Sequence, residues 1–408
     1  MTRTASPPAP RALIPLLAAA SAVTAANVYL NQPLLADAAA SLGASPAELG
    51  SVPTATQAGY AAGILLLVPA GDSLDRRRLI LGLGAASAAA LAACAVSPTV
   101  AFLIAASFAV GLLSPVPQLV TPLAVLLAGD RGRGRVVGTV QGGLLVGVLA
   151  SRAYAGALAD LVGWRAVYGC SCALTLVVVL VLRRVLPPVP PVSAGAYRAA
   201  LASLPRLLAR PPVLRVTGSG ALVGVAFGAF WTALTFLLEG HYHIGPTGIG
   251  LFGLVAAASA LASPYAGRAA ERLGRRGALA ALIGMVIAGW LVLLPGGTGL
   301  GWLVAGVVVL DVGVWGNQAA SQTVLLAGDP AAHNRLNTLY FTLRFLGIAL
   351  GSLLGSVAWA RGGWPAVAAV GLASAAAGLA VGVSGKDGPS PHDQPAAGTS
   401  RPKAGSSP

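Results

Sequence analysis

Three ionisable side chains stand inside apolar stretches of this sequence, where an isolated charge is costly. Asp311 follows "WLVAGVVVL", Arg152 lies within "GLLVGVLASRAYAG", and Arg344 follows "LYFTL". In a membrane interior each charge costs roughly 2.5–3.5 kcal/mol on insertion scales, so such residues tend to be paired or functional. A carboxyl group in this setting can bind and release a proton. We therefore expect Asp311 to act as a proton carrier.

The partners of these charges are left open by the sequence. Arg152 has a depth in its apolar stretch similar to that of Asp311, and the two could pair. Arg344 shares a helix face with an asparagine and a tyrosine that could satisfy it, or it could bind an anionic substrate. Glu239, at the end of another apolar stretch, is the second candidate for proton coupling.

Uncharged polar side chains recur at helical spacing in four apolar stretches. Positions three, four and seven apart lie on one helix face, so each set forms a stripe. A stripe can line a cavity for a small-molecule substrate, or it can hydrogen-bond one helix to another, and both interpretations stay open. The candidate cavity residues are Thr24, Asn27, Asn31, Gln118, Trp231, Thr235, Trp315, Gln318 and Gln322.

A proline interrupts the first of these stretches. Pro33 in "NVYLNQPLL" has no amide hydrogen, which leaves the carbonyl of Tyr29 without its helical donor. We therefore expect a kink at this point. Gln32 lies about 100° around the helix from Asn31, so it can face a neighbouring helix rather than the cavity.

The composition indicates that these stretches cross a membrane. Of the 408 residues 56% are hydrophobic and 9% are charged, and the mean hydropathy is +0.79, whereas a soluble domain has about 25% charged residues. The three cysteines have no metal-ligand spacing. No nucleophile and base set appears, and "GLGAAS" lacks the strand that a dinucleotide site needs. We therefore expect no enzyme, no cofactor and no metal site.

The expected architecture is an all-α membrane protein with twelve transmembrane helices. A span needs about 20 apolar residues. The first stretch follows two arginines as in a signal peptide, but it is too long for one and we interpret it as the first span. The expected spans are 12–36, 47–70, 79–97, 99–128, 136–160, 165–183, 214–239, 247–267, 277–296, 299–327, 336–360 and 364–383.

Basic residues set the expected orientation. With the N-terminus inside, nearly all of the 26 Lys and Arg residues fall on the cytoplasmic side, and only Arg165 and Arg361 fall in loops on the other. This positive-inside bias predicts that both termini are cytoplasmic. It also accounts for the net charge of +14 without a nucleic-acid partner.

The chain repeats itself with an offset of 199 to 200 residues. "VLLAGD" occurs at 125–130 and at 324–329, and "GWRAV" at 163–167 is echoed by "GWPAV" at 363–367. Each copy would contain six of the twelve expected spans. Because six is even, both copies would enter the membrane from the same side, so they are expected to be parallel repeats. The expected divisions are an N-terminal six-helix bundle (1–183), a cytoplasmic linker (184–213), a C-terminal six-helix bundle (214–384) and a disordered cytoplasmic tail (385–408).

Two loops of this chain resemble the signature of the major facilitator superfamily, G-x-x-x-D-R-x-G-R-R. "YLNQPLL" and "RLNTLY" further resemble a bacterial branch related to the drug:proton antiporters. The resemblance covers about 12–383 and implies a central cavity lined by spans 1, 4, 7 and 10, which are the spans that carry the stripes. The loop residues that carry it are Gly71, Asp75 and Arg76 in the first copy and Gly267, Glu271 and Arg272 in the second.

The loop residues have two possible roles. Their arginines can simply hold the loop on the cytoplasmic side. The resemblance implies instead a gating latch in which Asp75 pairs across the interface between the halves.

Antiporters of this superfamily often carry G-x-x-x-G-P-x-x-G-G in span 5, whereas the stretch 143–156 contains no proline.

These features predict a secondary active transporter that exports small organic molecules by alternating access and is coupled to protons. The alternatives are an importer or facilitator of a small metabolite on the same fold and, less favoured because long soluble loops are missing, a non-transporting membrane receptor. The expected partners are a small-molecule substrate, the proton and membrane lipid. A monomer in the cytoplasmic (inner) membrane, with many spans, is expected.

Overall fold

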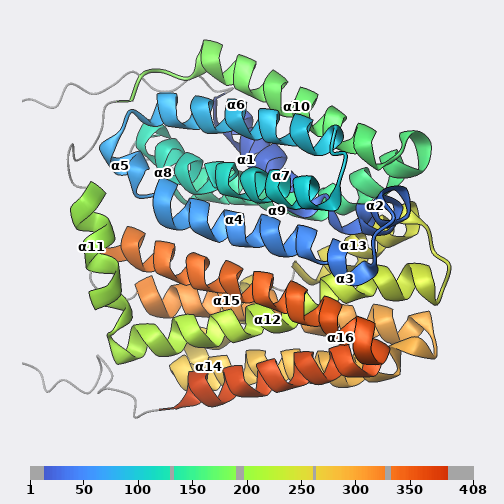
Figure 1. Ribbon diagram of the computed structural model, residues 1–408. Helices are drawn as coiled ribbons and strands as arrows, with labels where there is room; N and C mark the ends of the chain where they lie inside the picture. Colours follow the sequence, from blue (N-terminus) through green and yellow to red (C-terminus); the bar gives the residue numbers. More distant parts are fainter. Residues whose placement is uncertain (1–12, 129–132, 190–196, 261–262, 327–331, 385–408) are drawn as a thin grey trace, which may run out of the picture.

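The computed structural model describes the backbone of residues 13–128, 133–189, 197–260, 263–326 and 332–384. Within these ranges the side chains of 46–47, 128, 133–134, 256–260, 263–272, 274–275 and 326 lie outside the description. The expected tail after 384 and the linker residues 190–196 also lie outside it. Every regular element in the described part of the chain is a helix (Figure 1).

The first group of helices covers the N-terminal part of the chain. Figure 1 shows it in blue to green above the remaining long helices. Its elements are α1 (Leu13–Tyr29), η1 (Gln32–Leu34), α2 (Leu35–Leu42), α3 (Pro46–Leu49), α4 (Ser51–Leu67), α5 (Ala70–Ser73), α6 (Arg76–Ala95), α7 (Val100–Leu113), α8 (Val116–Ala128), α9 (Arg133–Val162) and α10 (Trp164–Val185).

The second group follows α11 (Tyr197–Leu208), which lies across one end of the molecule (Figure 1). We call this end the α11 end and the opposite one, where α2 and α3 lie, the α2 end. The elements of the second group are α12 (Pro211–Gly240), α13 (Pro246–Ala260), α14 (Ser263–Leu293), η2 (Leu294–Gly297), α15 (Leu300–Leu326) and α16 (His333–Val383).

Ten helical segments in the described part of the chain are long and apolar enough to cross a membrane. α16 counts as one of them although Gly362 and Gly363 depart from helical dihedrals, with φ of +61° at Gly363, a region that favours glycine. α13 is too short to count. α14 runs unbroken through 267–276, where we expected a loop, because "AAERL" is rich in strong helix formers.

Prolines break two of the expected spans. α1 ends at Tyr29 and the short 3₁₀ turn η1, which contains Pro33, joins it to α2. The kink expected from Pro33 is therefore present. The fourth expected span is divided into α7 and α8 at Ser114 and Pro115. There the hydroxyl of Ser114 donates to the carbonyl of Val110 at 2.6 Å.

Glycines bring pairs of helices into backbone contact. Within the first group α1 packs along α9, and within the second α12 packs along α16. A Cβ at Gly147 would overlap the carbonyl of Ala22, and one at Gly347 would overlap the carbonyl of Ala221. Small residues that allow such approach are typical of helix pairs in membranes. Ala22 and Ala221 are 199 residues apart, and Gly147 and Gly347 are 200 residues apart.

The two groups meet along α4 with α16 and along α9 with α13. At the α11 end, α11 touches both groups. The hydroxyl of Tyr197 donates to the carbonyl of Leu66 in α4 at 3.0 Å, and Arg335 Nη1 in α16 donates to Ser203 Oγ at 3.2 Å. α11 is thus hydrogen-bonded to both groups.

Candidate functional site

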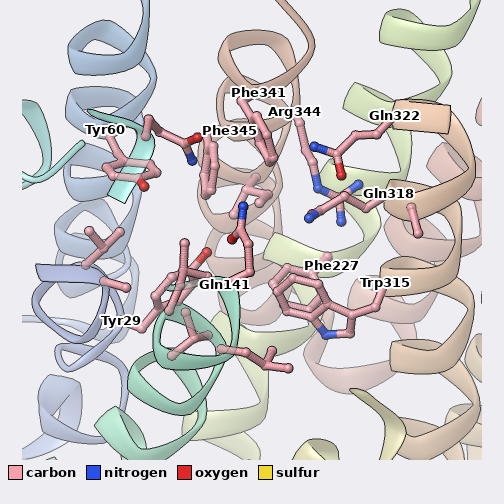
Figure 2. Close-up of a pocket in the computed structure, with 18 of the residues that line it drawn as sticks. Tyr29, Tyr60, Gln141, Phe227, Trp315, Gln318, Gln322, Phe341, Arg344 and Phe345 are labelled. Atoms are coloured by element: carbon pink, nitrogen blue, oxygen red, sulfur yellow. The ribbon is translucent and has the colours of Figure 1, made fainter. Parts of the chain in front are cut away.

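A cavity of about 410 Å³ lies between the two groups. Its volume falls in the range of roughly 300–1,000 Å³ that is usual for small-molecule sites, and aromatic side chains with a few polar groups form its walls. Figure 2 shows Tyr29 and Tyr60 on one side of it and Trp315, Gln318 and Gln322 on the other. Its polar and aromatic lining residues are Tyr29, Tyr60, Gln118, Gln141, Phe227, Trp315, Gln318, Gln322, Phe341, Arg344 and Phe345.

Many lining residues occur in pairs 200 positions apart. Gln118 in α8 and Gln318 in α15 form one such pair, and α9 and α16 contribute the others. This spacing equals the offset between the repeated sequence motifs. The side chains are identical in the pair of Gln118 and Gln318 but differ in the pairs from α9 and α16, so that Arg344 on one wall is opposed by the aliphatic Leu144 on the other. The pairs from α9 and α16 are Gln141 with Phe341, Leu144 with Arg344, Leu145 with Phe345, and Val148 with Ile348.

Among the described residues of the lining, Arg344 is the one with a charge. Its side chain is 3% exposed, and Nη1 and Nη2 donate to the hydroxyl of Tyr340 at 3.5 Å and to the carbonyl of Val314 at 3.3 Å. Among the described residues no carboxylate lies within 4.0 Å of its guanidinium. Tyr340 thus contacts it as the sequence suggested, but the positive charge of Arg344 is not neutralised by an ion pair.

Arg152 lies on the α2 side of the cavity and joins the two groups. Its Nε donates to Gln32 Oε1 at 2.6 Å, and its guanidinium carbon lies 3.9 Å from the ring centre of Trp231 and 5.4 Å from that of Tyr29. Cations over aromatic faces are stabilised by the ring quadrupole, the more so when water is excluded. Within the described structure its Nη2 has no hydrogen-bond partner.

Asp311 lies in α15 close to both arginines. It is 2% exposed, and the charges of Arg152 and Arg344 act on it. No hydrogen-bond partner of Oδ1 is found among the described residues, and neither arginine comes within 4.0 Å. Asp311 and Arg152, whose pairing the sequence left open, therefore lie near each other without forming an ion pair in the described structure.

Four residues of the predicted stripes line the cavity. Gln118, Trp315, Gln318 and Gln322 all do so, and the amide of Gln322 also donates to Asn337 Oδ1 at 3.2 Å. Trp315 stands one helical turn from Asp311, and it lines the cavity whereas Asp311 does not. Three of these residues come from α15, and the fourth expected span contributes Gln118.

The stripe of the first expected span does not line the cavity, because the amides of Asn27 in α1 and of Asn31 just beyond it bond to neighbouring helices. Asn27 Nδ2 donates to Thr175 Oγ1 in α10 at 3.0 Å, and Asn31 Nδ2 donates to Thr56 Oγ1 in α4 at 2.9 Å. Thr24 bonds back to the carbonyl of Ala20. Asn27 and Asn31 therefore join helices, which is the alternative that the sequence left open, whereas Thr24 bonds within its own helix.

Two further predicted cavity residues lie at the contact between the groups. Trp231 carries the guanidinium of Arg152 on its face, and Thr235 Oγ1 donates to the carbonyl of Gln32 at 3.2 Å. Gln32 thus faces a neighbour, as its place on the helix suggested. These residues close the α2 side of the cavity rather than line it.

Sequence reasoning missed most of the aromatic lining. Tyr29, Tyr60, Phe227, Phe341 and Phe345 look like ordinary membrane-helix residues, and α4, α9 and α16 had no polar stripe to mark them. The offset of 200 residues could have pointed to part of this set, since Phe341 and Phe345 are equivalent to positions on α9 that also line the cavity.

The predicted gating loop forms its contacts within the first group. Asp75 caps α6, since its Oδ1 accepts from the amide of Arg78 at 3.0 Å. Arg76 pairs with Asp72 at 2.7 Å and donates from Nε to the carbonyl of Gly71 at 3.0 Å. Asp75 therefore does not reach the second group here. In the second copy Gly267 belongs to α14, and the side chains of Glu271 and Arg272 lie outside the described structure.

Glu239 lies at the C-terminal end of α12, away from the cavity lining. Its Oε2 has no hydrogen-bond partner among the described residues, and the charge of Asp37 acts on it. His241 beside it bonds to the carbonyl of Gly297 at 2.8 Å. Glu239 is therefore separated from the arginines that surround Asp311.

The cavity leads toward the α11 end. A second cavity of about 230 Å³ shares Gln118 and Gln141 with the first and reaches Arg76 and Arg335. At the α2 end the groups are instead held together, because Asp160 Oδ2 in α9 accepts from the amide of Thr247 in α13 at 3.0 Å. This bond joins the two groups in addition to the hydrogen bond from Thr235 to Gln32 and the cation–π contact of Arg152 with Trp231.

A bundle of membrane-spanning helices with a cavity between two groups, each supplying part of the wall, defines a membrane carrier. The family model of the Major Facilitator Superfamily matches residues 17–352 and 216–406. The chain belongs to this superfamily and is a multi-pass membrane transporter of that type.

Similar proteins agree with this assignment. The chain is 37% identical over 374 residues to the "Uncharacterized transporter YgaY" of Escherichia coli O157:H7, covering 91% of this chain and 94% of that protein. It is 36% identical over 369 residues to the "Probable transporter SCO4007" of Streptomyces coelicolor, covering 89% and 85%. A bacterial homologue of the human lysosomal transporter Spinster, in an inward-facing and occupied conformation, has the same fold with a TM-score of 0.71 at 14% identity, covering 93% of this chain and 95% of that one.

Proposed function

We propose that this protein is a secondary active transporter that exports small organic molecules by alternating access, with protons as the coupling ion. The observation that carries the proposal is the cavity between the two groups, which takes its walls from both. In alternating access two rigid bundles rock around one central site, so residues of both bundles must meet the ligand. The sequence resemblance to the drug:proton antiporter branch also supports export coupled to protons.

The proposed architecture is twelve spans in two parallel six-helix halves, 1–183 and 214–384, joined by the linker 184–213. The cavity pairs 200 residues apart and the matching contacts at Gly147 and Gly347 support a duplicated unit. The distribution of Lys and Arg supports cytoplasmic termini in a bacterial inner membrane. The α11 end is then the cytoplasmic end, and a monomer in contact with lipid is the proposed working unit.

In this proposal the structure corresponds to an inward-facing state. The path from the cavity toward Arg76 and Arg335 supports access from the cytoplasm, and the bond of Asp160 to Thr247 supports closure of the outer side. To release a ligand outside, the contacts at the α2 end must break while α4 and α16 close the α11 end. We further propose that Asp75 pairs with the second group, as part of a gate, in the opposite, outward-facing state.

Asp311 is the proposed proton carrier. It is buried, close to two cations and without an ion-pair partner among the described residues, so gain or loss of a proton changes the charge next to the cavity directly. Trp315 connects this position to the cavity wall. Glu239 is the second candidate, because it lies near the end that must open to the outside.

The test uses purified protein in liposomes with an imposed pH gradient and a panel of neutral, cationic and anionic aromatic compounds. We expect at least one compound to accumulate against its gradient and to be released by a protonophore. Asp311→Asn should remove the accumulation but keep exchange of labelled for unlabelled compound. Glu48→Gln, an exposed acid in α3, is the control. Accumulation by Asp311→Asn equal to that of the original protein would exclude the coupling role.

An importer or facilitator of a small metabolite is the second candidate function. The stretch 143–156 favours it, because it contains no proline and so departs from the pattern common in antiporters. The direction of coupling separates the two. Accumulation when the proton gradient runs opposite to substrate movement supports the exporter, and accumulation when both move in the same direction supports the importer.

A further inference from the structure

The buried interior of the described structure has more positive than negative charge. Four charged residues are buried there, and Arg76 is paired with Asp72 near the α11 end. The other three are Arg152, Arg344 and Asp311, so one cation has no compensating acid. Because buried charges in membranes are normally paired, this excess indicates that an anion completes the site.

Arg344, rather than Arg152, is placed to meet that anion. Arg152 is held by Gln32 and by the faces of two aromatic rings, and it does not line the cavity. Arg344 lines the cavity, and the two hydrogen bonds that it makes are long and go to uncharged oxygens. A guanidinium with its charge unpaired is suited to a carboxylate or sulfonate, which accepts two parallel hydrogen bonds.

The walls around Arg344 are aromatic. The rings of Phe341 and Phe345 are stacked at 6.2 Å, Tyr60 meets Phe345 edge-on at 4.6 Å, and Phe227 meets Trp315 edge-on at 6.2 Å. Figure 2 shows these side chains around the same cavity as the guanidinium. Such surfaces bind a flat apolar ring by burial and by edge-to-face contact.

We propose that the substrate is an aromatic organic anion whose acidic group pairs with Arg344 while its ring lies among Phe227, Trp315, Phe341 and Phe345. This inference rests on the proposed transport function of the cavity and specifies its substrate class. A cation of the same shape meets repulsion from two arginines, and a neutral analogue leaves Arg344 uncompensated. The amides of Gln118 and Gln318 are left for polar substituents of the ring.

The test measures binding with three probes of one shape and different charge. These are 2-naphthoate, 2-naphthamide and 2-naphthylmethylammonium, titrated into the purified full-length protein and followed by calorimetry. We expect naphthoate to bind at least about tenfold more tightly than the amide, which corresponds to the stabilisation of roughly one charge-assisted contact, and the ammonium to bind most weakly. Equal affinities, a preference for the ammonium, or no binding of naphthoate would overturn the proposal.

Variants of Arg344 assign the preference to this side chain. Arg344→Gln should bind naphthoate and naphthamide equally, whereas Arg344→Lys should retain part of the preference. Arg361→Gln, an exposed arginine of the same helix, is the control and should retain all of it. A preference unchanged in Arg344→Gln would contradict the assignment. If that variant does not fold, the three probes on the original protein and on Arg344→Lys still decide the question.

Flux measurements keep this inference separate from the proposed function. Naphthoate that binds with the expected preference but does not cross the proteoliposome membrane would refute transport and leave the anion site standing. Flux of naphthamide or the ammonium that equals or exceeds flux of naphthoate would support transport and refute the substrate class.

Discussion

At the scale of single residues, the same type of side chain serves different purposes in this protein, and only its neighbours decide which. Asn27 and Gln318 are both buried or half-buried amides on predicted stripes. Asn27 bonds to Thr175 and joins two helices, whereas Gln318 faces the cavity. The helical period of a stripe identifies a shared face, but it does not say whether that face meets another helix or an open space.

Asn27→Ala is expected to weaken the fold and to leave substrate affinity unchanged. Hydrogen bonds between membrane helices contribute about 0.6 kcal/mol on average, and Thr175 keeps its own bond to the carbonyl of Ser171 after the change. Thermal unfolding in detergent should show a small loss of stability, while the KM for transport stays the same. A raised KM at normal stability would mean that Asn27 meets the substrate after all.

Asp75→Asn and Asp75→Ala separate the capping role of this residue from a role as a latch. Asparagine is as good a cap as aspartate, whereas alanine costs about 1 kcal/mol. If capping is its whole role, Asp75→Asn transports normally and Asp75→Ala is less stable. Loss of transport in Asp75→Asn, at normal abundance in the membrane, would indicate that its charge pairs with the second group in another state.

At the scale of elements, close helix contacts depend on single glycines whose surroundings differ along one helix. On α9 a Cβ at Gly147 meets the backbone of α1, whereas one at Gly142 meets nothing within 4 Å. Gly147→Ala should therefore separate α1 from α9 and lower the unfolding temperature. Gly142→Ala should stabilise α9 by up to about 1 kcal/mol, because alanine is the better helix former. Equal effects of the two changes on unfolding temperature would disprove the packing argument.

Some helix boundaries could be predicted from the sequence and others could not. Pro33 predicted the break after α1 correctly, because a missing amide hydrogen acts locally. The loop expected at 267–276 is part of α14, since a charged segment at a membrane surface can remain helical. The aromatic lining from α4 and α16 escaped notice, because apolar residues that face a cavity have the same composition as those that face lipid.

At the scale of the whole molecule, transport requires the contacts at the α2 end to open. Asp160→Cys combined with Thr247→Cys, in a protein whose own three cysteines are replaced by serine, should form a disulfide where the side chain of Asp160 now accepts from Thr247. We expect oxidation to stop transport and a reducing agent to restore it. Each single cysteine variant serves as the control. Full transport by the oxidised double variant would show that this contact does not open during the cycle.

The molecule as a whole was predictable to the level of its family. The apolar composition indicated a membrane protein, and the loop motif indicated the superfamily that the family comparison confirms. The substrate could not be predicted in the same way. It depends on how Arg344, Asp311 and the aromatic residues from distant helices come together, and no local pattern records that arrangement.

The surplus positive charge beside the cavity has an electrical consequence. With Asp311 ionised, the three buried charges sum to plus one when the site is empty and to zero when a monovalent anion is bound, and a proton on Asp311 in the returning empty carrier raises the sum to plus two. A membrane potential exerts about 2.3 kcal/mol per elementary charge for each 100 mV. Voltage should therefore act on the return of the empty carrier and hardly at all on the loaded one. Exchange of labelled for unlabelled anion would then proceed at the same rate at any voltage, while net flux would change with it.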